Sequence, residues 1–399
     1  MGLTSVTTPN PTTVVFHLNQ PFADFDYVVA IPQSTPVEPG WDTGSHSGAK
    51  FQLDPESTGP YQFEHYALNK QLTLVPNKYW NPATDPQARQ LASRIVVNMG
   101  MTQPEVDQDL LSGHAQVDLR GAGAPAGRIL ASPALKANAD SAPTGFLRFA
   151  YVNTHVVPNV HCRVAIEYAA DKTALQAAYG GPEAGGQIAS TVLPPTVLGY
   201  RAFDLYQATS RPGGDVGDAK AELRKCGKPG GFGVGIAYRT DQPGDPQAAT
   251  ALQAALRRAG IRATLHGFPE TKYFTFFAGV PAYVHAHDIG IALGTWGADW
   301  PDGFGFLYDL SDGSAIIPAG NSNIAEINDP VINNLFSRAM STTSATAVWP
   351  KIDLQIMKDA AILPIVYQKV LLYRPPDLTN VVVQDVWGSY DYAVLGRHK

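Results

Sequence analysis

The segment between residues 233 and 268 constrains the fold of this chain most strongly. Two apolar runs, GVGIAYR (233–239) and IRATLHGF (261–268), have the length and composition of buried strands. Between them, residues 247–259 repeat apolar side chains at helical spacing, and Gly260 is typical of the residue that ends a helix. A strand, a helix and a second strand in this order predict a parallel pair joined by a right-handed crossover, and therefore an α/β fold.

Two further segments extend this pattern. The run HDIGIALGTW (287–296) is strongly apolar, as expected of a strand buried on both faces in a parallel sheet. Earlier in the chain, RIVVNM (94–99) and AQVDL (115–119) each predict a strand. Between them, Thr102 and Glu105 form a capping box that opens a helix. These residues predict another strand-helix-strand unit, so we expect at least two lobes.

The amino-acid composition excludes several classes of protein. Hydrophobic residues make up 44% of the 399 residues, which excludes a disordered chain. The 29 Lys and Arg residues are outnumbered by 35 Asp and Glu and form no cluster, so nucleic acid is the least expected partner. The longest apolar candidate, residues 273–298, is interrupted by proline, histidine and aspartate, so no membrane span is expected. The first residues carry neither the basic nor the apolar part of a signal peptide.

The cysteine and histidine residues form no metal-binding motif. Cys162 and Cys226 are too few for a disulfide scaffold and lack metal-ligand spacing. They could form one bridge in an oxidising compartment or remain two buried thiols. His285, His287 and Asp288 lie together, but on a strand the two histidines would share one face and the aspartate the other. We therefore interpret them as the start of a strand and expect neither a metal site nor a cofactor.

An acidic and aromatic run, TWGADWPDGFGFLYDLSDG (295–313), holds the candidate ligand-binding residues. It leaves the carboxyl end of the apolar strand, where open parallel sheets place their ligand crevices. Its carboxylates do not follow the alternate-residue spacing of a calcium loop. Asp302 and Asp312 stand beside glycines, and we expect both to cap turns.

Asp299 differs from the other carboxylates of this run because it lies between Trp296 and Trp300. Indole rings on both sides would remove water from it, and a buried carboxylate needs a cationic or hydrogen-bonding partner. No Lys or Arg occurs between Lys272 and Arg338. The partner is therefore either the ammonium group of a ligand or a cation from a distant part of the chain.

Several motifs, taken in series, resemble one protein family. Together they are similar to the extracytoplasmic oligopeptide- and dipeptide-binding subunits of ABC importers, solute-binding protein family 5. The alanine-rich sequence looks like that of an actinobacterial member. The motifs are STGPYQF (57–63), LTLVPNKYWNP (72–82), RFAYVNT (148–154), CRVAIEYAADKTAL (162–175), GTWGADWPDGFGFLYDL (294–310) and ILPIVYQKVLLYRP (362–375).

The resemblance implies a two-lobed α/β clamshell, of the class II type of periplasmic binding protein, that closes on a peptide. Such a protein is not an enzyme and uses no cofactor. It would be a monomer that lies outside the cytoplasmic membrane and associates with it, as members of this lipoprotein family do. It would deliver peptides to the permease and ATPase subunits of an importer.

The resemblance also assigns residues to the expected binding site. In relatives, the Asp of the W-x-x-D run holds the α-amino group of the peptide, and Asp299 stands at that position. Backbone groups at the end of the preceding strand pair with the peptide as an added strand. Arg239, expected in the loop after an earlier strand, is the candidate for the peptide carboxylate. Cys162 and Cys226 would lie on helices of the same lobe, in an oxidising compartment. The expected ligand-binding residues are Gly294, Thr295, Trp296, Asp299, Trp300 and Arg239.

The resemblance predicts where the lobes begin and end. Residues 1–145 would form lobe I together with the remnant of an extra subdomain. Residues 146–373 would form lobe II, the ligand-binding α/β lobe, and residues 374–399 would return to lobe I. Family members carry further strands upstream of TTVVFHL (12–18), so lobe I is expected to be incomplete, with unpaired sheet edges.

Three alternatives to a peptide-binding protein stay open at this point. The same fold could bind a non-peptide solute such as a nickel chelate or a sugar. A hydrolase could use the acidic run as a carboxylate pair, although Asp299 lacks a second nearby carboxylate on the same face. The chain could also be a truncated fragment that binds nothing.

Overall fold

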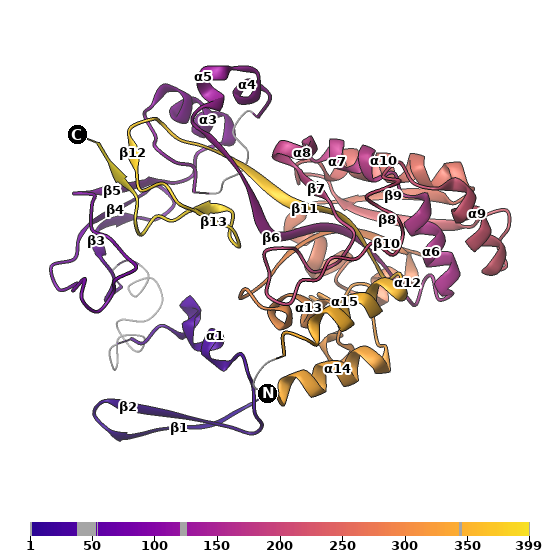
Figure 1. Cartoon of the computed structure of the whole chain (residues 1–399), viewed down its shortest axis with the longest axis horizontal. Coiled ribbons are helices and arrows are strands. Elements are labelled where there is room, and N and C mark those ends of the chain that lie inside the picture. Colours follow the sequence, from indigo (N-terminus) through magenta and orange to yellow (C-terminus); the bar gives the residue numbers. More distant parts are fainter. Residues whose placement is uncertain (1, 38–52, 54, 120–125, 343–344, 399) are drawn as a thin grey trace. The chain divides into compact units, whose positions relative to one another are not determined.

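Backbone contacts divide the chain into two units, and the central part of the sequence forms the larger one. The computed structural model (Figure 1) describes residues 2–37, 53, 55–119, 126–342 and 345–398. Unit 1 comprises Met1–Tyr27 and Pro143–Lys369, and unit 2 comprises Val28–Ala142 and Val370–Lys399. The resemblance had assigned the first 27 residues to the other lobe, whereas here they make their contacts with unit 1.

A six-stranded mixed sheet forms the centre of unit 1. Strands β8 and β9 are parallel along their whole length, and helix α10 connects them, as the sequence predicts. Strand β10 is parallel to β8 but antiparallel to β6, so its surroundings are not those of an all-parallel sheet. In order across the sheet, the strands are β7 (Gly186–Ile188), β11 (Ile362–Tyr373), β6 (Ala139–Val152), β10 (Ile291–Gly297), β8 (Gly233–Arg239) and β9 (Arg262–Phe268).

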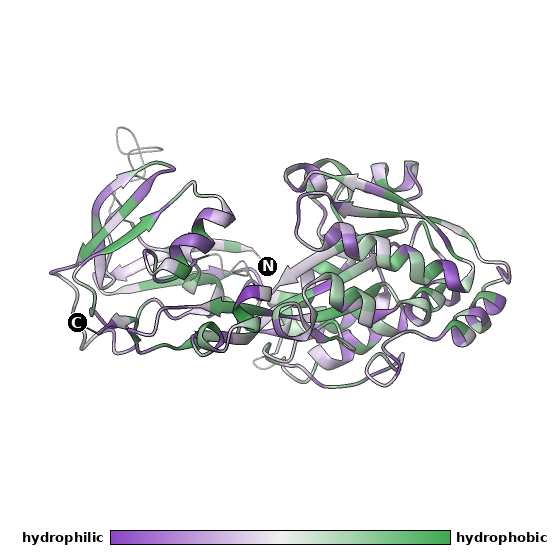
Figure 2. Ribbon diagram, turned by 90° about the horizontal axis from the view of Figure 1, so that it is seen from above, coloured by the Kyte–Doolittle hydropathy of each residue, from purple (hydrophilic) through white to green (hydrophobic). Residues whose placement is uncertain are grey.

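Helices cover both faces of this sheet, and each face has its own hydrophobic core. Alternate residues of β10 belong to different cores, since Ile291 and Leu293 pack with one and Ala292 with the other. In Figure 2 hydrophobic residues colour the interior of this unit, and hydrophilic ones lie more at its periphery. One core includes α6 (Val160–Ala169), α7 (Lys172–Ala178), α9 (Val216–Lys225) and α10 (Asp245–Ala259); the other includes α12 (Pro281–Ala286), α13 (Gly303–Ser311), α14 (Pro330–Met340) and α15 (Trp349–Lys358).

Unit 2 contains a three-stranded antiparallel sheet and helix α3 (Gln103–Ser112). The capping box of Thr102 and Glu105 is present, and Gly113 ends the helix in the left-handed conformation. The predicted strand at residues 115–119 is wrong, because the chain turns back there and the Ala115 N–H donates to the Asp109 carbonyl. The expected strand-helix-strand unit is therefore absent from the described residues. The sheet consists of β3 (Tyr61–Ala67), β4 (Gln71–Pro76) and β5 (Ile95–Asn98).

The first residues of unit 1 form a hairpin with little burial. Within the described part of the chain, strands β1 (Leu3–Asn10) and β2 (Thr13–Leu18) pair only with each other, and every residue of β1 is exposed. The remaining short elements are α1 (Phe25–Ala30), η1 (Pro32–Ser34), α4 (Ala126–Ala131), α5 (Pro133–Lys136), α8 (Gly181–Ala184), α11 (Glu270–Lys272), η3 (Tyr273–Phe277), η4 (Gly313–Ala315), β12 (Leu378–Thr379), β13 (Val383–Gln384), β14 (Ser389–Tyr390) and β15 (Gly396–Arg397).

Candidate functional site

The carboxyl ends of β8 and β10 meet at one edge of the sheet in unit 1. Strand β8 ends at Arg239 and β10 ends at Gly297. Strand β6 runs the other way beside β10, and its register places Arg148 directly opposite Thr295. Open sheets bind ligands at this edge, so the candidate site is built from residues of three neighbouring strands.

Strands β8 and β10 separate before they end. Their parallel register covers only Ile291 and Ala292 of β10, although β10 pairs with β6 through to Gly297. Tyr273, which is fully buried, shares its hydroxyl proton between the carbonyl oxygens of Ala237 in β8 (3.1 Å) and Leu293 in β10 (2.9 Å). The hydroxyl thus satisfies backbone groups where the two strands part. Beyond the residues that pair with β8, β10 is hydrogen-bonded within the described chain to β6 alone.

The predicted residues Gly294, Thr295 and Trp296 occupy this singly paired end of β10. Gly294 is required by close packing, because a Cβ there would lie 2.7 Å from the ring of Tyr151. Thr295 and Trp296 are half-buried. Among the described residues, the buried Trp296 Nε1 has no hydrogen-bond partner, which is uncommon for an indole nitrogen. Within the described residues this end of β10 pairs with β6 alone, and its pairing with an added strand stays a prediction.

Arg239 is the last residue of β8, as the run GVGIAYR predicts, and its role toward a peptide carboxylate stays a prediction. The residue is only 4% exposed, and its Nε donates to the Asp245 carboxylate at 2.7 Å. Nη1 lies 3.5 Å from Glu270, and Nη2 donates to the Thr295 hydroxyl at 3.4 Å. Burial by itself would lower the pKa of Arg239, but Asp245 raises it overall. One buried carboxylate therefore already balances this charge.

Arg148 belongs to the same cluster and was not predicted from the sequence. Its Nη1 donates to the Thr295 hydroxyl at 3.4 Å, and its guanidinium lies 4.5 Å from the centre of the Tyr179 ring. The Tyr179 hydroxyl in turn donates to Asp245 at 3.1 Å. Burial lowers the pKa of Arg148, and Tyr179 and Asp245 oppose that effect. A single arginine within the otherwise hydrophobic run FLRFAYV was the signal available in the sequence.

Asp299 lies just after β10, in the loop that leads to α13. The expectation of a buried carboxylate between two indole rings is wrong, because the residue is exposed. Among the described residues nothing hydrogen-bonds to its carboxylate, although its backbone N–H donates to the Gly305 carbonyl. Partial desolvation and then repulsion from Asp309 raise its pKa. Asp309 is therefore a second carboxylate whose charge acts on Asp299.

Trp300 packs away from Asp299. Its Nε1 donates to Asp24 at 2.9 Å, and its ring stacks with Tyr27 and Phe304 at centroid distances of 6.4 Å and 6.1 Å. These contacts connect the N-terminal segment to the loop after β10. The ring is thus fixed by internal packing, which is a structural reason for a tryptophan at this position.

The two aspartates that were predicted to cap turns, Asp302 and Asp312, both accept hydrogen bonds from backbone N–H groups at the start of a turn. Asp302 accepts the Phe304 N–H at 2.9 Å, and its other oxygen accepts the Trp349 indole N–H at 3.1 Å. Burial and the neighbouring Asp24 raise the pKa of Asp302 to about 6. Asp312 accepts the Ser314 N–H at 2.8 Å. Asp302 thus caps the start of α13, and Asp312 caps the start of the short η4 that follows it.

A sequence profile described as "Bacterial extracellular solute-binding proteins, family 5 Middle" matches residues 2–316. The chain belongs to this family. The membership agrees with the expected α/β binding-protein fold and with a binding protein rather than an enzyme.

Individual relatives support this membership. The solved structure of "Clavulanic acid biosynthesis oligopeptide binding protein 2" is 36% identical, with a TM-score of 0.93, and the match covers 99% of this chain and 72% of that one. The peptide complex of DppA from Helicobacter pylori is 20% identical with a TM-score of 0.74, covering 100% and 74%, which shows the fold alone. A curated relative, the "Probable D,D-dipeptide-binding periplasmic protein DdpA" of Escherichia coli strain K12, is 24% identical over 347 residues. That match covers 85% of this chain and 62% of the relative's length.

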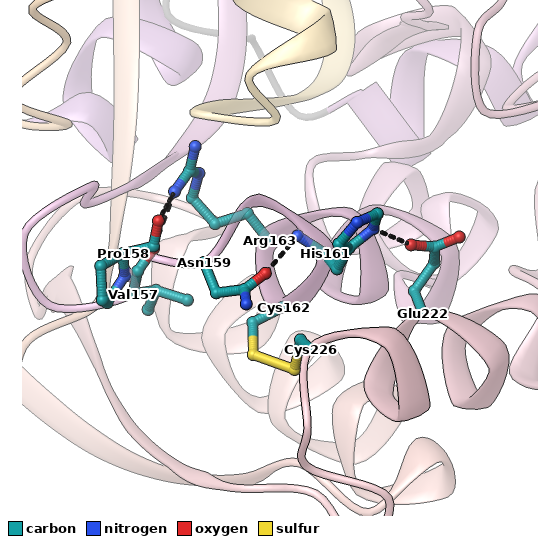
Figure 3. The surroundings of a disulfide bond; sticks show 8 residues. All are labelled: Val157, Pro158, Asn159, His161, Cys162, Arg163, Glu222 and Cys226. Atoms are coloured by element: carbon teal, nitrogen blue, oxygen red, sulfur yellow. Dashed lines mark hydrogen bonds and ion pairs between the residues drawn. A yellow bond between two sulfur atoms is a disulfide. The ribbon is translucent and has the colours of Figure 1, made fainter.

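A disulfide joins two helices on one face of the sheet in this solute-binding protein. Cys162 of α6 and Cys226, which follows α9, are bonded, with a Cα separation of 5.4 Å. Figure 3 shows a second link between the same helices, in which the His161 ring lies 2.7 Å from the Glu222 carboxylate. The Asn159 side chain caps α6 by accepting the His161 N–H. The bridge therefore spans 64 positions of the sequence in the middle of unit 1.

The histidines interpreted as the start of a strand lie elsewhere. His285 is in α12 and His287 follows that helix, so the expected strand geometry is wrong. His285 Nε2 lies 2.8 Å from the Glu326 carboxylate, and its ring stacks on His155. Within the described parts of the chain, no three His, Cys, Asp or Glu side chains are grouped so that they could hold a metal ion. No helix there is long and apolar enough to span a membrane.

Proposed function

We propose that this chain is the ligand-binding part of a peptide-binding component of an ABC importer. One observation carries the proposal: the singly paired end of β10 offers backbone groups to an extended ligand, and the unpaired carboxylate of Asp299 follows directly. A peptide has both the main chain that can add to such an edge and the ammonium group that such a carboxylate can bind.

The relatives are consistent with this ligand class. The matched proteins include an oligopeptide-binding protein, a probable D,D-dipeptide-binding periplasmic protein, and a periplasmic binding protein, DppA, in complex with a peptide. The chain spans 62% of the length of the curated relative, so ligand and partners of the whole protein are part of the proposal. The proposal also includes that the protein delivers its ligand to the permease and ATPase subunits of the importer and that it acts as a monomer.

We also infer an extracytoplasmic location, in association with the membrane. The disulfide between Cys162 and Cys226 supports it, because such bridges persist mainly in oxidising compartments. A non-peptide solute, such as a nickel chelate or a sugar, is the second candidate ligand. The exposed Asp299 favours a cationic group on the ligand and therefore a peptide over a neutral sugar.

The proposal is tested first by native mass spectrometry of the purified chain, followed by calorimetry with an equimolar mixture of random tetrapeptides. A charge-assisted hydrogen bond contributes roughly 1.5–3 kcal/mol, so Asp299→Asn should weaken binding about ten- to a hundredfold. N-acetylation of the peptides should weaken binding to the wild type by a similar factor and add little in the variant.

A matched control is available at the other end of β10. Asp288 is also exposed, and it precedes the strand rather than following it, so Asp288→Asn should leave the affinity unchanged. If acetylated and free peptides bind the wild type equally well, Asp299 does not hold an ammonium group. If no peptide binds and none co-purifies, the peptide function itself is refuted.

A further inference from the structure

A glutamate and a lysine are buried together in unit 1, outside the candidate ligand site. The side chains of Glu167 in α6 and Lys172 in α7 are 0% and 3% exposed. The Lys172 Nζ lies 3.9 Å from the nearer Glu167 oxygen, which is too far for a hydrogen bond. Burying two charges costs free energy, and their attraction offsets this cost only when further hydrogen bonds satisfy both groups.

The carboxylate of Glu167 has no hydrogen-bond donor. Both of its oxygens are buried, and neither has a partner within the described residues. The neighbouring Tyr206 hydroxyl donates its proton to the Met357 carbonyl at 2.6 Å. Lys172 Nζ donates to the Ala189 carbonyl at 3.2 Å, which leaves two of its three N–H groups. Burial raises the pKa of Glu167 to about 7 and lowers the pKa of Lys172, so each charge requires a further polar partner.

A small cavity adjoins both side chains. It offers about 10 Å³ to the centre of a water-sized sphere, which is about the space that one water molecule requires. Glu167 and Lys172 line this cavity together with Tyr206, Arg211 and Asp215. Arg211 and Asp215 form an ion pair with each other, so the buried charges of the wall are those of Glu167 and Lys172.

We infer that this cavity is a binding site for one water molecule, which bridges Glu167 and Lys172. The water accepts a hydrogen bond from the Lys172 ammonium group and donates one to the Glu167 carboxylate, so each charge gains the partner that it lacks. The Tyr206 oxygen, whose own proton is used, is available as a second acceptor. The site is independent of the proposed peptide-binding function, because none of its residues belongs to the candidate ligand site.

The charges of the wall favour a neutral occupant over an ion. A cation in the cavity would lie beside the Lys172 ammonium group and an anion beside the Glu167 carboxylate, so a like charge would repel either ion. The occupant must also be both a donor and an acceptor of hydrogen bonds. Water meets both conditions and fits the available volume.

The test combines a high-resolution crystal structure of the whole chain with oxygen-17 magnetic relaxation dispersion, which counts the water molecules held inside a protein in solution. The crystal structure should show a water within about 3.2 Å of both a Glu167 oxygen and the Lys172 Nζ. The dispersion measurement should count one long-lived water fewer in the double variant Glu167→Met/Lys172→Met than in the wild type, because apolar cavities stay dry.

A matched control is Lys220→Met, which removes an exposed lysine from α9 and should leave the water count unchanged. Crystals soaked in rubidium chloride distinguish water from a monovalent cation, since rubidium scatters anomalously. If the double variant does not fold, the crystal structure of the wild type decides the question by itself.

Three results would overturn the inference. The first is a direct contact between Lys172 Nζ and the Glu167 carboxylate with no water beside it. The second is an anomalous rubidium signal in the cavity, which would show a cation site. The third is an equal number of long-lived waters in the wild type and in the folded double variant. None of these results affects the peptide-binding proposal, which calorimetry with peptides tests separately.

Discussion

Breaking the bond between Cys162 and Cys226 should cost unit 1 a large part of its stability. The bridge joins α6 to the end of α9, and both cysteines are buried, at 6% and 9% exposure. Opening it in the unfolded chain releases a loop of 64 residues. The chain-entropy relation for a loop of this length gives about 4 kcal/mol at room temperature. That is a substantial share of the ~5–15 kcal/mol by which domains are usually stable.

The assay is urea unfolding of the wild type and of the double variant Cys162→Ala/Cys226→Ala, followed by tryptophan fluorescence and circular dichroism. The unfolding free energy of the transition assigned to unit 1 should fall by about 4 kcal/mol in the variant. Adding a reductant should produce a similar loss in the wild type and no change in the variant.

A non-covalent link between the same two helices provides the control. The His161 ring contacts the Glu222 carboxylate and its side chain is 45% exposed, so His161→Gln should cost less than about 1 kcal/mol. The reasoning is refuted if the double variant loses less than about 1 kcal/mol, because the bridge would then not restrict the unfolded chain.

Two further predictions concern the stability of the described elements. In the folded protein, burial and the neighbouring Asp24 raise the pKa of Asp302 to about 6. Protonated Asp302 therefore contributes to the stability of unit 1 fully at pH values below its unfolded pKa, and this contribution is lost as the pH rises through about 6. In Asp24→Asn, the unfolding free energy of unit 1, measured in urea, should therefore decrease less between pH 4 and 7 than in the wild type. Asp26→Asn changes an exposed residue and should leave this pH dependence as it is. An equal pH dependence in both variants would contradict the prediction. Amide exchange should be slower in β8 and β10, which are largely buried, than in β1, whose residues are all exposed, and in β5, none of whose residues is buried. Equal protection of all four strands would show that burial does not determine the free energy of local opening.

The sequence alone determined the elements whose signals are local. The strand-helix-strand unit at residues 233–268 forms as predicted, because apolar periodicity and a helix-ending glycine act within one segment. The capping roles of Asp302 and Asp312 follow for the same reason, since a carboxylate binds backbone N–H groups two residues away. The serial motifs were specific enough to indicate the family, which the profile match establishes.

Predictions of secondary structure and burial were wrong where the sequence pattern was short or where it fits both a helix and a strand. Residues 115–119 are apolar enough for a strand, but they fold back onto the end of α3. His285 was assigned a strand position by its proximity to β10, yet the chain is helical there. Asp299 is exposed although tryptophans flank it, because Trp300 turns to pack against Tyr27 and Phe304.

Only the tertiary structure decided how the candidate site is assembled. Arg148 and Thr295 are 147 positions apart, and the register between β6 and β10 alone places them opposite each other. Tyr273 hydrogen-bonds to both β8 and β10 through its hydroxyl, and no sequence pattern distinguishes it from an ordinary core tyrosine. Whether a buried charge has a partner depends on groups brought together across strands. A sequence shows which charges exist, but burial and strand register determine which of them remain unmatched.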